Sequence, residues 1–336
     1  MEKLIDSYGR QINYFRISLT DRCNFRCIYC SPVEKKFRFV EHEHILRFEE
    51  VLEIVRVAVE MGMTKIRLTG GEPLVRKGVI DFIKQLKQVN GLEDISMTTN
   101  GYYLSEMAHF LRSAGLDRVN ISLDSLDREK FKKITGFDGL SKVLEGIDTA
   151  LQEGLTPVKI NVVLLKGINE DEVDNFIKLT INKPLSVRFI ELMPTNHELK
   201  EINQEHFISV QKIQEDIQIR FPDARLTLLD KGCGPAFYCQ LPGAKGVFGF
   251  ITPVSQHFCA RCNRIRLTAE GNLRPCLFSI RELELKNKLR EIPPNQYALR
   301  RRIIKCFLKE AVLKKPLYHR FDEKNITEFD MSQIGG

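Results

Sequence analysis

The 336-residue sequence has no tryptophan and no apolar run near the roughly 20 residues that cross a bilayer. The absence of such a run excludes a predicted membrane-spanning helix. The start Met1-Glu2-Lys3 is not followed by the apolar core of a signal peptide. We therefore expect a cytoplasmic protein without a membrane partner. The absence of tryptophan excludes no function, and 43% hydrophobic and 28% charged residues are ordinary for a globular chain.

Cysteine is present in an odd number, nine, and six of the nine fall into two groups of three. In a chain expected to lie in a reducing compartment, grouped cysteines favour metal binding over disulfides. The formal net charge is +7, which suits a polyanionic partner. Charge alone does not distinguish a nucleic acid from a small phosphate ester.

Short β-rich runs alternate with helical patterns from residue 14 to about residue 220. This alternation predicts an α/β fold with a parallel sheet, and six units without a linker favour a full or partial (β/α)6 barrel. The expected strands are Tyr14–Leu19, Lys65–Thr69, Ile95–Thr99, Arg118–Leu123, Pro157–Leu165 and Leu185–Leu192. The expected helices are Phe48–Met61, Val79–Val89, Leu104–Ala114, Leu140–Gln152 and Asp171–Thr180.

The expected strands alternate polar and apolar residues instead of forming continuous apolar runs. Lys65 and Arg67 share one face of a strand, as do Lys159 and Asn161 of another. Because helices cover the outer face, the polar face should point into the barrel. The sequence therefore predicts a wet, partly basic lumen that suits a charged small ligand, although single charges could instead cap strand ends in solvent.

The pattern changes after about residue 220, where short β-like pieces are separated by glycine and proline. We expect residues 1–220 to form the partial barrel and residues 221–336 to form a smaller module laid against its open side. The β-like pieces are Phe237–Leu241, Val247–Thr252 and Arg264–Thr268, and helical patterns follow near 281–290 and 298–313.

The first cysteine group is Cys23, Cys27 and Cys30, directly after the first expected strand. Loops at the carboxyl ends of barrel strands carry the chemistry of such folds. Three thiolates can hold three irons of a four-iron cluster and leave the fourth iron open to a ligand. The alternative is a structural zinc site, for which His42 and His44 are the nearest candidates for a fourth ligand.

The C-x3-C-x2-C spacing, with Tyr29 before its last cysteine, resembles the signature of the radical S-adenosylmethionine (SAM) superfamily. Gly70-Gly71-Glu72-Pro73 and Ser122 resemble that superfamily's SAM-contacting segments. The resemblance implies a TIM-like partial barrel, and an open iron that binds SAM. One electron would then cleave SAM to methionine and a 5′-deoxyadenosyl radical.

The second cysteine group is Cys259, Cys262 and Cys276. Its residue types again suit an open iron–sulfur cluster, and the alternative is a zinc knuckle with His257 or Cys239 as fourth ligand. Arg264 and Arg266 alternate on an expected strand between these cysteines, so both should point one way. Two adjacent guanidinium groups are well suited to phosphate oxygens.

The segment from Phe258 to Cys276 resembles a narrower family, the MoaA-type GTP 3′,8-cyclases of molybdenum cofactor biosynthesis. The resemblance covers nearly the whole chain. Further matching blocks are Ser18–Cys23, Lys65–Leu74, Thr98–Gly101, Asn120–Asp124, Val158–Val162 and Val187–Glu191, and the chain ends in Gly335-Gly336. Departures are Ser31-Pro32, where the family often has Met-Pro, and the residues before the final glycines.

The resemblance implies two 4Fe–4S clusters, SAM and GTP. The radical would abstract hydrogen from C3′ of GTP, and C3′ would bond to C8 to give (8S)-3′,8-cyclo-7,8-dihydroguanosine 5′-triphosphate. Arg16, Gly335 and Gly336 would be catalytic, and SAM would contact Tyr29, Gly71, Ser122 and Met193. The residues implied for GTP are Arg16, Arg67, Thr98, Lys159, Arg188, Arg264, Ile265 and Arg266.

The implied partners are a flavodoxin- or ferredoxin-like electron donor, cyclic pyranopterin monophosphate synthase as recipient of the product, and a second copy in a homodimer. The closest alternative is another radical SAM enzyme with an auxiliary cluster, of the peptide-maturing kind. A metal-stabilised RNA-binding module would also suit the charge, but it would need a basic outer face, so we expect no nucleic-acid partner. Cys233, Cys239 and Cys306 receive no role.

Overall fold

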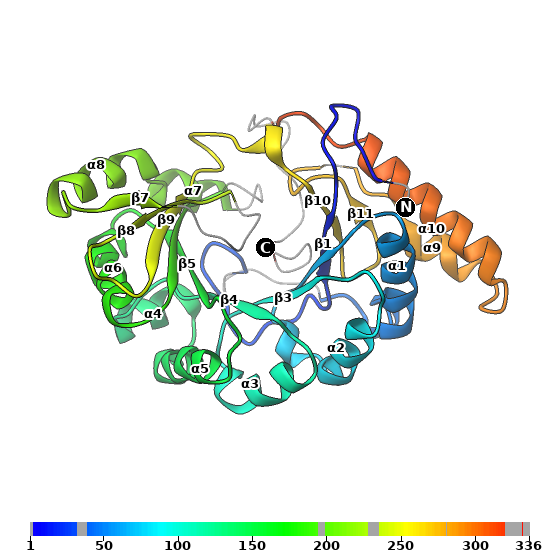
Figure 1. Cartoon of the computed structure of the whole chain (residues 1–336), viewed down its shortest axis with the longest axis horizontal. Coiled ribbons are helices and arrows are strands. Elements are labelled where there is room, and N and C mark those ends of the chain that lie inside the picture. Colours follow the sequence, from blue (N-terminus) through cyan, green and yellow to red (C-terminus); the bar gives the residue numbers. More distant parts are fainter. Residues whose placement is uncertain are drawn as a thin grey trace.

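A curved parallel sheet forms the centre of the computed structural model, which describes residues 3–31, 39–193, 199–227, 235–279, 281–319 and 331. Six strands follow one another along the sheet in chain order, each parallel to the next. They are β1 (Tyr14–Ser18), β2 (Lys65–Thr69), β3 (Asp94–Thr99), β4 (Arg118–Ser122), β5 (Lys159–Leu164) and β6 (Ser186–Glu191). Figure 1 shows these strands curving around a central space with helices outside them, which confirms the expected partial barrel.

The outer helices are amphipathic, and their apolar faces pack on the sheet. In α1 (Phe48–Glu60), for example, Val51, Ile54 and Val55 are buried. The others are α2 (Val79–Lys87), α3 (Leu104–Ser113), α5 (Leu140–Gln152) and α6 (Val173–Asn182). The sequence pattern did not predict α4 (Arg128–Thr135), which is strongly polar. Asp127 caps its start by accepting a hydrogen bond from the Lys130 amide, and Gly136 ends it in the left-handed conformation.

The C-terminal strands extend the barrel sheet at both of its edges. At one edge β9 (Val247–Ile251) pairs in parallel with β6, and β8 (Phe237–Gln240) and β7 (Arg225–Thr227) follow antiparallel. At the other edge β10 (Arg264–Leu267) pairs in parallel with β1, and β11 (Leu273–Arg274) follows antiparallel. The C-terminal residues thus continue the sheet, where we expected a module laid against it. The pairing satisfies backbone groups that two open edges would expose.

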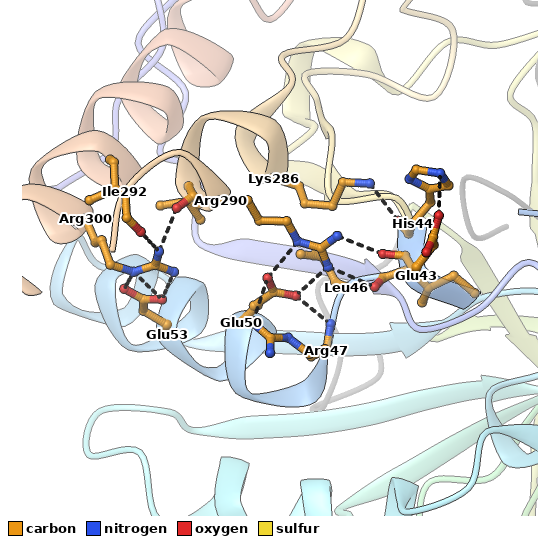
Figure 2. A network of polar contacts seen from close by, with 12 residues as sticks. Glu43, His44, Leu46, Arg47, Glu50, Glu53, Lys286, Arg290, Ile292 and Arg300 are labelled. Atoms are coloured by element: carbon orange, nitrogen blue, oxygen red, sulfur yellow. Dashed lines mark hydrogen bonds and ion pairs between the residues drawn. The ribbon is translucent and has the colours of Figure 1, made fainter. Parts of the chain in front are cut away.

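The remaining helices are α7 (Lys200–His206), α8 (Val210–Arg220), α9 (Leu285–Arg290) and α10 (Tyr297–Leu313). Polar contacts attach α9 and α10 to α1 (Figure 2). Arg290 donates from Nε to Glu50 at 2.9 Å, and Arg300 donates from Nη2 to Glu53 at 2.6 Å. In the described part of the chain, no helix is both long enough and apolar enough to cross a membrane.

Candidate active site

Two adjoining pockets occupy the inner side of the sheet, and each contains one cysteine group. The first-cysteine pocket is lined by Cys23, Cys27, Cys30, Tyr29, Gly71, Thr98 and Ser122. The second-cysteine pocket is lined by Cys259, Cys262, Cys276, Arg16, Arg67, Lys159, Arg188, Arg264 and Arg266. The two pockets share Asn161, Ile190, Met193 and Met331, so they form one continuous chamber with a cysteine group in each part.

The loop that carries the first cysteines is fixed by backbone contacts on both sides. Its Arg26 and Ile28 amides donate to the carbonyls of Thr135 and Ile134 at the end of α4. On the other side, a Cβ on Gly71 would lie 2.4 Å from the Arg22 carbonyl oxygen, closer than real contacts allow. Only glycine therefore permits the Gly70-Gly71 turn to approach the cysteine loop this closely.

Tyr29 joins the cysteine loop to the barrel strands. Its hydroxyl donates a hydrogen bond to the carboxylate of Asp124, which also accepts from the Val163 amide at 2.7 Å. Burial raises the pKa of Asp124 to about 6, although these two hydrogen bonds act to lower it. The contact places the Tyr29 ring in the wall of the first-cysteine pocket.

Burial dominates the electrostatics of the first cysteine group. It raises the pKa of Cys23 to about 11, with a smaller contribution from Glu72, and it raises the pKa of Cys27 well above its usual range. Uncompensated thiolates would therefore be costly here, and iron supplies the positive charge that favours the thiolate form. Buried thiols that face a pocket together fit a metal cluster better than they fit solvent-exposed redox chemistry.

The second cysteine group comes from two elements. Cys259 and Cys262 flank a short turn that leads into β10, and Cys276 follows β11. Burial would raise the pKa of Cys262, but Arg264 and Lys315 lower it to about 6. Lys315 is buried, and its Nζ donates to the carbonyls of Arg264 and Pro275 at 2.8 and 3.0 Å. A cationic setting of this kind stabilises thiolate ligands.

The spacing of the thiols argues against the zinc alternatives. Three sulfurs on one tetrahedral zinc stand about 3.8 Å apart, because each Zn–S bond is about 2.3 Å. Among the described residues, only the exposed set Glu41, Glu43 and His44 brings three ligand atoms within 4.8 Å of one another. Neither cysteine triad therefore forms a closed single-ion site among the described residues. A cubane binds each thiolate through a different iron, which suits the wider spacing.

The second-cysteine pocket concentrates buried cations. Burial, together with repulsion from Arg188, Arg67 and Arg118, lowers the pKa of Lys159 to about 7. Burial together with Arg264 lowers the pKa of Arg266 to about 9. So many buried like charges are costly, and an anionic ligand would remove that cost. The partly basic lumen expected from strand alternation is thus present, with Arg16, Arg67, Lys159 and Asn161 on its wall.

Two residues implied for GTP lie apart from the others. Thr98 lines the first-cysteine pocket, and its hydroxyl has no hydrogen-bond partner among the described residues. The side chain of Ile265 belongs to the hydrophobic core on the other side of β10, so only its backbone can face a ligand.

Gly335, Gly336 and Cys233 lie outside the described residues. Cys239 packs against the hydrophobic core, and Cys306 is exposed on α10.

Sequence reasoning missed His319, which follows α10 and lines the second-cysteine pocket. Its Nδ1 lies 2.8 Å from the Sγ of Cys259. The sequence offers His257 or Cys239 as a fourth ligand beside these cysteines, whereas the Nδ1 of His257 contacts the Pro253 carbonyl oxygen at 3.0 Å. A single histidine sixty positions beyond Cys259 carries no spacing signal, so only the fold reveals it.

Comparisons with known proteins agree with this chemistry. The family model of the Radical SAM superfamily matches residues 17–180, and the model named Molybdenum Cofactor Synthesis C matches residues 185–321. The GTP 3′,8-cyclase of Petrotoga mobilis is 46% identical over 334 residues, covering 99% of this chain and 100% of that protein. The GTP 3′,8-cyclase of Thermodesulfovibrio yellowstonii is 50% identical over 285 residues, covering 85% and 88%.

Among solved structures, Streptococcus suis SuiB bound to S-adenosylmethionine has a TM-score of 0.57 over 95% of this chain and 78% of that chain. At 13% identity this likeness shows the fold alone. The near-complete match to curated relatives, together with a partial barrel and two cysteine triads facing one chamber, identifies the chain as a member of the GTP 3′,8-cyclase family of radical SAM enzymes.

Proposed function

We propose that this chain converts GTP to (8S)-3′,8-cyclo-7,8-dihydroguanosine 5′-triphosphate, the first step of molybdenum cofactor biosynthesis. The observation that carries the proposal is the chamber, in which two cysteine triads lie in adjoining pockets and buried cations line the second of them. The cofactors are two 4Fe–4S clusters and SAM. The peptide-maturing alternative is disfavoured because the curated cyclases match the chain over nearly its whole length.

The first-cysteine pocket is the proposed SAM end. Cys23, Cys27 and Cys30 would hold the first cluster, and SAM would contact Tyr29, Gly71, Ser122 and Met193. When bound, this cluster would supply the electron that cleaves SAM to the radical that takes hydrogen from C3′ of GTP. The protein's part is to orient the reactants and exclude water. The close approach of Gly71 and the Tyr29–Asp124 hydrogen bond hold the loop for that task.

The second-cysteine pocket is the proposed GTP end, where Cys259, Cys262 and Cys276 would hold the second cluster. The triphosphate would lie against the buried cations, whose lowered pKa values reflect burial and mutual repulsion that phosphate oxygens would relieve. They are Arg16, Arg67, Lys159, Arg188, Arg264 and Arg266, with Arg16 also catalytic. Thr98 and the backbone of Ile265 complete the proposed GTP contacts, and Gly335-Gly336 would reach the same chamber.

The proposal extends to organisation and partners. Residues 1–220 would form the barrel and 221–336 the auxiliary module, since α8 ends at Arg220 and the antiparallel strands begin at β7. A flavodoxin- or ferredoxin-like protein would donate the electron, and the product would pass to cyclic pyranopterin monophosphate synthase. We also propose a homodimer and a cytoplasmic location, where reducing conditions keep the cysteines available for clusters.

The test is turnover with labelled substrate. Protein reconstituted without oxygen is incubated with SAM, dithionite and GTP deuterated at C3′, and the products are analysed by mass spectrometry. We expect 5′-deoxyadenosine to form only with GTP present and to carry deuterium. Cleavage of SAM with unlabelled 5′-deoxyadenosine and unchanged GTP would overturn the substrate assignment while leaving the radical SAM chemistry intact.

A further inference from the structure

The segment from Lys315 to His319, here called the strap, crosses the second cysteine site directly after α10. Its first residue is fixed by the two hydrogen bonds that Lys315 donates to the carbonyls of Arg264 and Pro275. Its second residue is fixed from the other end of the chain, because Arg10 donates from Nη2 to the Pro316 carbonyl at 2.8 Å. The same guanidinium donates from Nη1 to the Cys259 carbonyl at 2.6 Å. The strap and the first cysteine of the group are therefore held by one residue.

His319, the last residue of the strap, is held by rings on two sides. Phe278 stacks on it with centroids 4.8 Å apart and planes at 19°, and His257 meets it edge-on at 4.4 Å. Only 8% of the residue is exposed. In this setting its Nδ1 points at the Sγ of Cys259 over 2.8 Å. The two rings fix the rotamer of His319, and the hydrogen bonds of Lys315 and Pro316 fix the backbone that leads to it. The surrounding structure therefore holds the contact between Nδ1 and Sγ in place.

The first cysteine site shows a related arrangement. There the side-chain amide nitrogen of Asn100 lies 3.8 Å from the Sγ of Cys23, which is also the first cysteine of its group. Asn100 is itself held, because its backbone amide donates to the buried carboxylate of Glu72 at 2.6 Å. Each site therefore presents one side-chain nitrogen to the sulfur of its first cysteine.

We propose that His319 is a positioning residue of the second cluster, donating a hydrogen bond from Nδ1 to the cluster-bound sulfur of Cys259. A thiolate bound to iron can only accept, so the proton must lie on Nδ1. Hydrogen bonds to cluster sulfurs help set reduction potential, because the N–H dipole stabilises the more negative, reduced state. His319 thus favours the reduced form of the second cluster. It also fixes the Cys259 side of the cluster face that would bind GTP, so this inference rests on the proposed function.

The first test is a redox titration followed by electron paramagnetic resonance. It uses full-length chains with Cys23, Cys27 and Cys30 changed to alanine, so that the signal comes from the second cluster alone. His319→Phe keeps the ring and removes the donor, whereas His319→Asn can return an N–H near the Nδ1 position. The matched control is Tyr318→Phe, a neighbour in the strap whose residue is 56% exposed.

We expect His319→Phe to lower the ratio of reduced to oxidised cluster about threefold at the wild-type midpoint potential, a shift to more negative potential. His319→Asn should recover part of the shift, and Tyr318→Phe should cause none. Equal potentials in His319→Phe and Tyr318→Phe would overturn the proposal.

The second test needs no substitution. In the wild-type holoenzyme labelled with ¹⁵N-histidine, pulsed resonance should show weak nitrogen coupling to the reduced second cluster. A strong coupling typical of a directly bound nitrogen, or no coupling at all, would overturn the hydrogen bond, even if His319→Phe failed to assemble its cluster. Neither test uses GTP, so a failed turnover assay would remove the proposed function and leave this inference separately decidable.

Discussion

At the scale of single residues, Gly71 and Lys159 are the two positions where the pockets depend most clearly on one residue type. Gly71 lets one turn touch the cysteine loop, and Lys159 is a buried amine among guanidinium groups. Gly71 is required because any side chain would meet the Arg22 backbone, and Lys159 buries an amine that water would solvate better. Each of these two features gives a measurable consequence.

Gly71→Ala should damage the first cluster selectively. The added Cβ would meet the Arg22 carbonyl oxygen at 2.4 Å, so the cysteine loop must move. We expect roughly half of the iron to be lost, together with SAM cleavage, while the second cluster remains, as measured by iron analysis and Mössbauer spectroscopy. The control is Gly167→Ala, where the φ of +74° strains the backbone but nothing lies within 4 Å of the new Cβ. Equal damage in both variants would show that steric contact at Gly71 is unimportant.

Lys159 should make GTP binding depend on pH. Burial and neighbouring cations lower its pKa to about 7, so about half of the free protein carries a neutral amine near neutrality. Triphosphate favours the charged form and raises the pKa in the complex. Binding should therefore be strongest below pH 7 and weaken as pH rises toward 9, with proton uptake detectable by calorimetry in buffers of different ionisation enthalpy.

Lys159→Arg provides the matched control, because a guanidinium group is a much weaker acid than an ammonium group. It should flatten the pH dependence between pH 7 and 8 and leave the titration of GTP itself, while Arg266, whose pKa is about 9, titrates above this range. Lys159→Met should weaken GTP binding about tenfold or more at pH 7, the effect of losing a charged hydrogen bond. A pH profile that is the same for wild type and Lys159→Arg would contradict the assignment.

At the scale of elements, two arginines, of which Arg300 is buried, attach the C-terminal helices to α1. Arg290 contacts Glu50 on α1 and also donates from Nη1 to the Glu43 carbonyl at 2.7 Å, and Lys286 donates to the His44 carbonyl (Figure 2). The carbonyl contacts fix the segment that follows the first cysteine loop. The α9–α10 unit is therefore attached to α1 on one side and continues into the strap on the other.

The Glu50–Arg290 pair should be worth about 1–3 kcal/mol in a double-mutant cycle on the free energy of unfolding. Burial would raise the pKa of Glu50, but hydrogen bonds from Arg290 and Arg47 lower it to about 2. A carboxyl whose pKa is depressed on folding stabilises fully above its unfolded pKa, near 4.5. That contribution is lost as pH falls toward 2.

The cycle uses Glu50→Gln, Arg290→Met and the double variant at pH 7. Denaturation of the metal-free chains between pH 5 and 3 then tests the pH dependence, which Glu50→Gln should reduce. Lys84→Met at the exposed Asp81–Lys84 pair is the control, since exposed pairs contribute little. Additive effects of the two substitutions would show that the contact carries no coupling.

At the scale of the whole molecule, one continuous sheet connects the loops that carry the two cysteine groups. β10, which follows Cys262, pairs in parallel with β1, which precedes Cys23, so the two groups lie at opposite ends of neighbouring strands despite their separation in sequence. Parallel pairing fixes the register between Tyr14 and Arg264 and between Arg16 and Arg266. The sheet therefore sets the separation that a mononucleotide must span.

Cys276→Ala should separate the two halves of the reaction. Losing one ligand of the second triad should remove that cluster and abolish cyclised product. The first cluster should remain and still cleave SAM slowly with dithionite. Iron content, visible absorbance and yields of 5′-deoxyadenosine and product measure these outcomes, and Cys306→Ala, on the exposed face of α10, should change none of them. Retained cyclisation in Cys276→Ala would contradict the proposed use of the second cluster.

The sequence by itself determined much of the barrel, and it predicted which cysteines would hold the metal clusters. The strand Lys65–Thr69 and the helix Leu140–Gln152 have the expected bounds, because alternation and helical period are local and each buries its own apolar face. The cysteine triads are recognisable because the number of residues between their cysteines is read directly from the sequence. The same locality explains the failure at α4, whose polar sequence gives little periodic signal and whose stability comes from its cap and its packing.

Only the tertiary structure decided which distant residues meet. It placed His319 against Cys259 and Lys315 beneath Arg264, and it attached the C-terminal strands to both sheet edges. It also assigned Thr98 to the first-cysteine pocket and turned Ile265 into the core. These contacts join residues tens to hundreds of positions apart, and they depend on sheet register and on the path of the chain after α10. No local pattern encodes that path, because the free energy that selects it comes from packing the whole molecule at once.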